Sequence, residues 1–198
     1  MNENIFRIFA ATIFLTGLGI SIYFRSKADR DSGKKVSFKD EGRVMFLTLR
    51  IGGLVLWLSM LGYLIYPPLL VWSKVGLPEW ARWLGVGLGL LCVFLIYWMF
   101  SSIGTGITPT VATRSSHKLV TKGPYRWIRH PLYTFGTVFF LSFALMADSW
   151  FIALMAVLAI VLLTIRLTNE EAHLIEKFGN EYHEYMQRTG RYLPKIAK

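Results

Sequence analysis

Residues 131–167 read PLYTFGTVFFLSFALMADSWFIALMAVLAIVLLTIRL, and this stretch decides the fold. It contains two apolar segments, 131–147 and 150–167, that are separated only by Asp148 and Ser149. Each segment is close to the length that an α-helix needs to cross a bilayer. Because the connection is so short, the two segments are expected to lie side by side as an antiparallel helical hairpin.

Three further apolar segments precede this hairpin, at about residues 5–24, 44–66 and 83–103. The chain has 198 residues, of which 54% are hydrophobic, and these are concentrated in long blocks. A soluble fold would instead scatter them at the period of a helix or a strand. The blocks also lack the alternation of apolar and polar residues that is typical of membrane β-strands. We therefore predict an all-α, polytopic membrane protein with about five transmembrane helices.

Basic residues gather on one side of this predicted arrangement. Residues 25–43 carry seven Lys or Arg and residues 104–130 carry five, whereas residues 67–82 carry only Lys74 and Arg82. The positive-inside rule then places the basic connections and the C-terminus in the cytosol. The same rule explains the net charge of +10, so we expect no nucleic-acid partner. If the protein is prokaryotic, the membrane is the cell membrane.

Residues 169–188 follow the last apolar segment and are amphipathic. The apolar positions at three- and four-residue spacing are Leu174, Ile175, Phe178, Tyr182 and Tyr185. This spacing predicts a cytosolic helix that lies on the membrane or caps the bundle. We expect an N-terminal three-span region at 1–103 and a second region at 104–198, which comprises a loop, the hairpin and the C-terminal helix. Together they are expected to form one integrated domain.

Polar chemistry gathers where the hairpin begins, in GPYRWIRHPLYTFG at residues 123–136. Pro131 suits the first turn of a helix, where its missing N–H is not needed. The N-terminus of that helix presents N–H groups and the positive end of its dipole, which attract a carboxylate. Tyr125, His130 and Tyr133 add hydrogen-bonding groups and ring faces.

The hairpin returns the chain to the same side of the membrane, where Arg166, Glu170 and Glu171 follow. A carboxylate there could bind an ammonium group, another cation or a ribose hydroxyl. The two halves together predict a pocket for a zwitterion with a positive centre, which meets the cytosol on one side and lipid on the other. The alternative is that the basic residues only follow the positive-inside rule, and that Arg129 pairs with one of the glutamates.

Two other motifs have structural explanations. Glu170 and His173 have a spacing found in di-iron helical bundles, but that chemistry needs a second such pair inside the bundle. No histidine falls within a predicted span, so we assign no metal ligands. Gly85 and Gly89 form a GxxxG motif, which we interpret as close helix packing within the chain rather than as a dimer face.

Two stretches carry a resemblance to a known family. They are HKLVTKGPYRWIRHPLY at residues 117–133 and RLTNEEAHLIEKFGNEYHEYMQRTGRYLPKI at residues 166–196. Both resemble the isoprenylcysteine carboxyl methyltransferases, and they are most similar to the short prokaryotic members, including archaeal ones. The first 100 residues resemble the family only as generic spans.

The resemblance implies a membrane-embedded methyltransferase that uses S-adenosylmethionine. The residues that it assigns to the cofactor are His117, Lys118, Leu119, Val120, Tyr125, His130, Pro131, Leu132, Tyr133 and Glu170. It also implies that Arg166 faces the acceptor group, so we predict Arg166 and Glu170 as the catalytic residues. Vertebrate members are longer and act on prenylated protein ends, so the acceptor here need not be a prenylcysteine.

The leading hypothesis is methyl transfer to a lipophilic acceptor that arrives from the bilayer, such as an isoprenylcysteine-like carboxylate or another small lipophilic molecule. A carboxylate needs no general base, and Arg166 could orient it through two hydrogen bonds. An amine or hydroxyl would need a base, with Glu170, Glu171 or His130 as candidates. Two alternatives stay open: an NADPH-dependent membrane reductase of the sterol-reductase type, and a non-catalytic membrane protein that binds anionic lipid or a partner.

Overall fold

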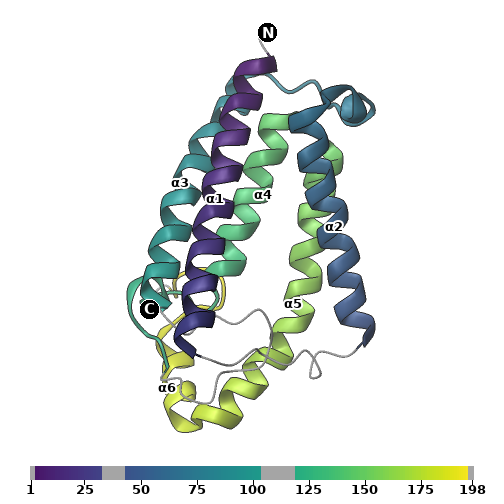
Figure 1. The fold of residues 1–198 in the computed structure, drawn as a ribbon. Helices are drawn as coiled ribbons and strands as arrows, with labels where there is room; N and C mark the ends of the chain where they lie inside the picture. Colours follow the sequence, from purple (N-terminus) through teal and green to yellow (C-terminus); the bar gives the residue numbers. More distant parts are fainter. Residues whose placement is uncertain (1–2, 33–42, 104–118, 196–198) are drawn as a thin grey trace.

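The computed structural model describes residues 3–32, 43–103 and 119–195, and its long helices form a bundle (Figure 1). The long helices are α1 (Glu3–Ser32), α2 (Arg43–Ile65), α3 (Glu79–Ile103), α4 (Pro131–Ala147) and α5 (Trp150–Phe178). Shorter helical segments are η2 (Pro67–Ser73), η4 (Gly123–Arg126) and α6 (Asn180–Arg188). The all-α class predicted from the sequence is confirmed.

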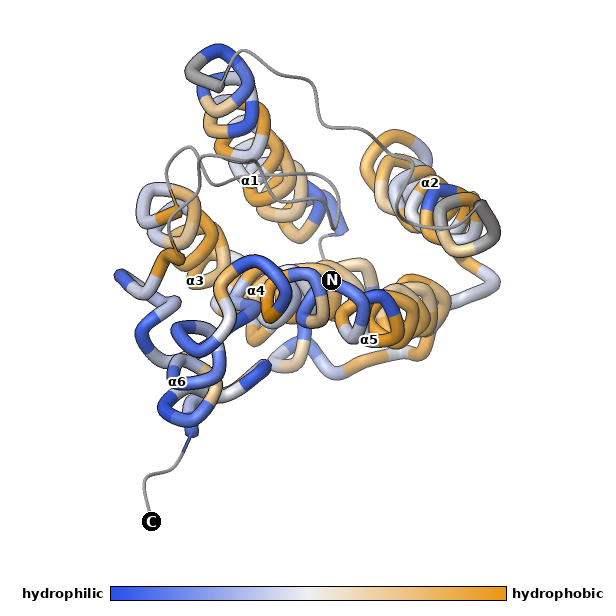
Figure 2. The backbone as a smooth tube through the Cα atoms, turned by 90° about the horizontal axis from the view of Figure 1, so that it is seen from below, coloured by the Kyte–Doolittle hydropathy of each residue, from blue (hydrophilic) through white to orange (hydrophobic). Residues whose placement is uncertain are grey.

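Four of these helices are long and apolar enough to cross a bilayer. They are α1 over Glu3–Arg30, α2 over Leu47–Ile65, α3 and α5. α4 is also apolar but has 17 residues, which is short for a hydrocarbon core of about 30 Å. Figure 2 shows apolar residues along the five long helices and polar residues concentrated on α6. The chain is thus a polytopic membrane protein with four candidate spans and α4 as a shorter apolar helix.

α4 and α5 form the predicted hairpin at Asp148 and Ser149. Asp148 ends α4 in the left-handed conformation, with φ of 55°, and Ser149 caps α5 by accepting a hydrogen bond from Ile152 N at 3.3 Å. The carboxylate of Asp148 also accepts hydrogen bonds from Gly76 N at 3.2 Å and Leu77 N at 2.9 Å. These bonds fix the turn to the connection before α3. α4 itself packs against α3 and α5 and lies between them (Figure 2).

The last spanning helix is longer than predicted. We expected it to end at Leu167 and a separate amphipathic helix to cover residues 169–188, but α5 continues to Phe178. No glycine or proline interrupts α5, so nothing in its sequence ends the helix earlier. The break comes at Gly179, whose φ of 53° is left-handed, and α6 follows. Arg166, Glu170 and Glu171 therefore all lie on α5, which is also the second helix of the hairpin.

The GxxxG motif on α3 faces α4, as predicted for packing within the chain. A Cβ atom at Gly85 would lie 2.8 Å from the carbonyl oxygen of Ser142. One at Gly89 would lie 3.2 Å from Ser142 Oγ and 2.9 Å from Ile13 Cδ1 on α1. α3 and α4 approach each other this closely because both positions lack a side chain.

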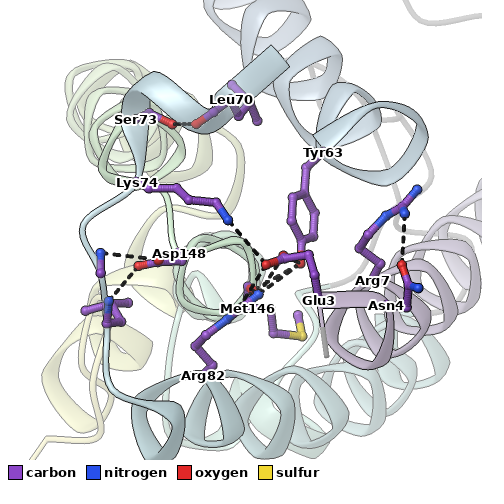
Figure 3. A network of polar contacts seen from close by, with 12 residues as sticks. Glu3, Asn4, Arg7, Tyr63, Leu70, Ser73, Lys74, Arg82, Met146 and Asp148 are labelled. Carbon is purple, nitrogen blue, oxygen red and sulfur yellow. Dashed lines mark hydrogen bonds and ion pairs between the residues drawn. The ribbon is translucent and has the colours of Figure 1, made fainter. Parts of the chain in front are cut away.

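An ion pair between the buried guanidinium of Arg82 and the partly exposed carboxylate of Glu3 closes one end of the bundle (Figure 3). Arg82, at the start of α3, is 1% exposed, and its Nη1 and Nη2 donate to the two carboxylate oxygens of Glu3 at 3.2 and 2.8 Å. Arg82 Nε and Nη2 also donate to the carbonyl oxygen of Met146, at 3.0 and 2.6 Å. Tyr63 Oη donates to Glu3 at 2.9 Å, and Lys74 Nζ lies 3.3 Å from the same carboxylate. We call these four side chains and the Met146 carbonyl the Arg82 cluster; it joins α1, α2, α3 and α4.

Candidate functional site

The start of α4 and the short helix α6 lie at the other end of the bundle (Figure 1). Residues of both line a cavity of about 510 Å³. Its lining comes from α1 to α6 and from the segment that precedes α4. Apolar side chains such as Phe14, Trp57 and Ile160 make up most of that lining, and the polar groups come mainly from the start of α4 and the end of α5. This volume is within the range of small-molecule binding sites.

Nine of the residues predicted for the site line this one cavity. They are Leu119, Val120, Tyr125, His130, Pro131, Leu132, Tyr133, Arg166 and Glu170. Two more predicted residues, His117 and Lys118, lie outside the described residues. They lie in the segment before α4, at the start of α4 and in the second half of α5, and the antiparallel hairpin brings the start of α4 close to that part of α5.

Glu170 and Tyr133 face each other at the polar part of the cavity. Tyr133 Oη donates a hydrogen bond to Glu170 Oε2 at 2.6 Å. The imidazole ring of His130 stacks on the Tyr133 ring, with centroids 5.7 Å apart, and His130 Nδ1 lies 3.9 Å from Glu170 Oε1. Pro131, which lies between His130 and Tyr133 in the sequence, is the first residue of α4, as predicted. The Glu170 carboxylate is thus oriented by a tyrosine while it lines the cavity.

Glu171 has different surroundings from its neighbour Glu170. It is 4% exposed and accepts a hydrogen bond from Arg129 Nε at 3.1 Å, while His130 Nε2 lies 3.2 Å away. It also pairs with Arg191, and the hydrogen bond to Glu171 raises the pKa of that guanidinium. We call Arg129, His130, Glu171 and Arg191 the Glu171 cluster. The ion pair that the alternative interpretation expected for Arg129 therefore exists, but it involves Glu171 and leaves Glu170 on the cavity.

The C-terminal segment after α6 holds the start of α4, a role that the sequence did not reveal. Arg129 N donates to Gly190 O at 2.8 Å, His130 N donates to Arg191 O at 3.2 Å, and Gly190 N donates to Trp127 O at 3.0 Å. These bonds make a short parallel pairing between two loop segments. Such a pairing joins segments far apart in the chain and carries no periodic pattern, so the sequence offered no signal for it.

α1 also lines the cavity, although its sequence suggested only a generic span. Phe14, Gly17, Ser21 and Arg25 contribute from this helix. Arg25 Nε donates to Ser21 Oγ at 3.2 Å, and its guanidinium carbon lies 5.9 Å from the centre of the Phe100 ring. Arg25 follows the predicted span at residues 5–24 and belongs to the basic segment 25–43, so nothing in the sequence distinguished it from its basic neighbours.

The groups around the cavity suit an organic ligand that carries both a positive and a negative group, because Arg25, Arg129 and Arg166 line it together with Glu170. In the part of the chain that the structure describes, no group of three His, Cys, Asp or Glu side chains is placed to hold a metal ion. His173 Nδ1 lies 2.8 Å from the carbonyl oxygen of Asn169, one turn back on α5. Glu170, in contrast, presents a carboxylate to an otherwise largely apolar space. Such a carboxylate attracts an ammonium or sulfonium group.

The fold and the site define a polytopic helical membrane protein with a ligand-sized cavity at one end of its bundle. Residues 80–181 match the phospholipid methyltransferase family. This match covers more than half of the chain, and the chain belongs to that family, whose members are membrane methyltransferases that use S-adenosylmethionine. The resemblance drawn from the two sequence stretches is thereby confirmed.

Several curated relatives and one solved structure are similar to the chain. The nickel-cobalt-cadmium resistance protein NccN of Alcaligenes xylosoxydans xylosoxydans is 32% identical over 87 residues, which cover 44% of this chain and 41% of that protein. The protein-S-isoprenylcysteine O-methyltransferase of Schizosaccharomyces pombe is 29% identical over 114 residues, which cover 55% of this chain and 48% of that protein. The chain therefore spans less than half the length of these relatives.

The solved structure is that of a eukaryotic intramembrane Ras methyltransferase, an isoprenylcysteine carboxyl methyltransferase. It aligns with a TM-score of 0.60 and 21% identity, over 95% of this chain and 68% of that one. The alignment shows that the two chains share a fold.

Proposed function

We propose that this chain transfers a methyl group from S-adenosylmethionine to a lipophilic acceptor at the membrane. The observation that carries the proposal is that nine predicted residues, from both sides of the hairpin, line one cavity. Membership of a family of membrane methyltransferases supports the reaction type and the cofactor. Family members act on lipophilic or prenylated substrates, which agrees with a cavity lined mainly by apolar side chains.

The residues at the polar part of the cavity fit this cofactor. When bound, S-adenosylmethionine supplies a methyl group on a positively charged sulfur. Glu170, oriented by Tyr133, would offset positive charge on the ligand. The N-terminus of α4 at Pro131 would attract the ligand carboxylate through the positive end of its dipole. The remaining residues of the proposed cofactor site are His117, Lys118, Leu119, Val120, Tyr125, His130 and Leu132.

The apolar part of the cavity fits the acceptor. We propose that Arg166 orients the acceptor group, and Arg25 on α1 gives the same cavity a further guanidinium. For a carboxylate acceptor the chain needs to supply only alignment of the two reacting groups and exclusion of water. For an amine or hydroxyl acceptor, Glu170 and His130 are the better candidates for a base, because Glu171 is already engaged by Arg129 and Arg191.

We also propose that α4 crosses the membrane with the other four helices and that the polar part of the cavity faces the cytosol. The ends of α1 and α3 that lead into the basic segments 25–43 and 104–130 lie at the same end of the bundle as α6 (Figure 1). The positive-inside rule assigns that end to the cytosol. Regions 1–103 and 104–198 would act as one integrated domain, since helices of both line the cavity.

Calorimetric binding of S-adenosylhomocysteine to the detergent-purified chain tests the proposal, with NADPH as the matched control. We expect micromolar binding of S-adenosylhomocysteine alone, and its loss in Tyr133→Ala and Glu170→Ala. Binding of NADPH alone would assign the chain to a reductase of the sterol-reductase type. Binding of neither, together with salt-sensitive binding to anionic vesicles, would favour a non-catalytic membrane protein. Wild-type affinity in both variants would show that the site is misplaced.

A further inference from the structure

Tyr182 on α6 carries a hydroxyl that makes no hydrogen bond within the part of the chain that the structure describes. The residue is 1% exposed and lines the cavity, and its Oη is buried without a hydrogen-bond partner among the residues that the structure describes. Its neighbour Tyr185 shows the usual arrangement, because Tyr185 Oη donates to the carbonyl oxygen of Tyr125 at 2.6 Å. A buried hydroxyl without a partner lowers stability, so such groups call for an explanation.

The surroundings of Tyr182 indicate what kind of ligand group would satisfy it. The centroid of its ring lies 5.9 Å from the centroid of the Tyr185 ring. Tyr125 and Phe178 line the same cavity. Burial raises the pKa of Tyr182, so the hydroxyl stays protonated and can donate a hydrogen bond. Flat aromatic faces beside one donor suit a planar heterocycle whose ring nitrogens or ribose oxygens accept hydrogen bonds.

We propose that Tyr182 donates a hydrogen bond to the nucleoside part of the ligand, and that the rings of Tyr125, Phe178, Tyr182 and Tyr185 form the nucleoside end of the cavity. This inference rests on the proposed function, because it assumes S-adenosylmethionine as the ligand. α6 then contributes directly to ligand binding, in addition to capping the bundle. The division of roles is that Glu170 offsets the ligand's positive charge, and the aromatic residues hold its nucleoside.

Tyr182→Phe tests this assignment because it removes a single oxygen atom from a ring that stays packed. We expect S-adenosylhomocysteine and adenosine each to bind about three- to tenfold more weakly, the usual effect of losing one hydrogen bond. The unfolding temperature without ligand should stay the same or rise, since a buried hydroxyl without a partner is removed. Both affinities are measured by calorimetry on the detergent-purified full chain.

Tyr63→Phe is the matched control, because Tyr63 is also a buried tyrosine but belongs to the Arg82 cluster and donates to Glu3 at 2.9 Å. It should lower the unfolding temperature and leave both affinities unchanged. If wild type binds the ligands and Tyr182→Phe binds them equally well, the inference fails while the proposed function stands. A clear fall in the unfolding temperature of Tyr182→Phe would also overturn it, since the hydroxyl would then have a partner in the fold. If wild type binds neither ligand, both proposals fail together.

Discussion

The Arg82 cluster and the Glu171 cluster lie at opposite ends of one bundle, and both place charged side chains between helices. In the Arg82 cluster, the guanidinium is shared between the two oxygens of Glu3 and the carbonyl of Met146. In the Glu171 cluster, Arg129 and Arg191 engage Glu171, but the adjacent Glu170 lines a cavity of about 510 Å³. The hydrogen bonds of the Arg82 cluster are made within the protein, whereas the Glu171 cluster lies beside a cavity large enough for a ligand.

This difference indicates that the Arg82 cluster contributes to stability and that the residues around Glu170 contribute to ligand binding. A buried guanidinium whose hydrogen bonds are all made inside the protein holds helices in register and leaves little for a ligand to contact. A carboxylate that lines a cavity is oriented by its neighbours and keeps a free side for a ligand. Changes in the Arg82 cluster should therefore alter stability alone, whereas changes around Glu170 should alter affinity.

The largest effect is expected from Arg82→Ala. The change leaves Glu3 and the carbonyl of Met146 without their main donor, so the free energy of unfolding should fall by about 3 kcal/mol. Thermal unfolding in detergent measures it. Arg30→Ala, on the exposed end of α1, is the control and should have little effect. A loss for Arg82→Ala no larger than that of the control would contradict a structural role for the cluster.

Gly190→Ala should lower both the stability of the fold and the affinity for the ligand. A Cβ atom there would overlap the carbonyl oxygen of Leu193, so the segment that pairs with the start of α4 must move. Overpacking of this kind costs about 1–3 kcal/mol, and affinity for S-adenosylhomocysteine should fall because His130 loses its backbone partner. Gly87→Ala is the matched control, since a Cβ at Gly87 meets nothing within 4 Å. Equal behaviour of the two variants would show that the tail does not support the site.

Glu170→Gln should reduce affinity without reducing stability. The amide keeps the shape of the side chain but removes the charge, so binding of S-adenosylhomocysteine should weaken at least about tenfold, or about 1.4 kcal/mol. The free energy of unfolding should change by no more than about 0.5 kcal/mol. Glu176→Gln, at an exposed position of the same helix, tests whether charge alone explains the result. The account would be wrong if both substitutions weakened binding equally.

The smallest effect is expected from Ser149→Ala, near the Arg82 cluster. Ser149 caps α5 and its Oγ lies 2.7 Å from Ser73 Oγ, so the loss should be about 1 kcal/mol of stability. Calorimetry should show unchanged affinity for S-adenosylhomocysteine. Ser101→Ala, at an exposed site, is the control for loss of a serine hydroxyl. A changed affinity would mean that the two ends of the bundle are coupled.

The sequence predicted those features that depend on local pattern. The long apolar segments predicted the spanning helices, and Pro131 predicted the start of α4. The two-residue turn at Asp148 implied the hairpin, and the hairpin implied that Arg166 and Glu170 return to the residues around His130. Two helix ends were wrong, because charged residues continue a helix as readily as apolar ones: α5 runs past Leu167 to Phe178, and α1 runs past Phe24 to Ser32.

Other features depend on contacts between distant segments, which no local pattern encodes. Glu3 and Arg82 are 79 residues apart, and each alone resembles an ordinary charge at a helix end. Arg25 resembled one of many basic residues after the first span, yet it lines the cavity. The residue pattern alone could not distinguish Glu170 from Glu171, and only the family resemblance singled out Glu170, because their roles differ through the partners that the fold supplies.

The most direct test is the rise in unfolding temperature that S-adenosylhomocysteine causes in wild type, Arg82→Ala and Glu170→Gln. A ligand at 100 times its dissociation constant stabilises a folded protein by about 2.7 kcal/mol. We predict that Arg82→Ala unfolds at a lower temperature but keeps the rise seen in wild type. Glu170→Gln should unfold at the wild-type temperature without ligand and lose most of the rise. A rise that disappears in Arg82→Ala, or persists in Glu170→Gln, would contradict the assignment of binding to one end of the bundle and stability to the other.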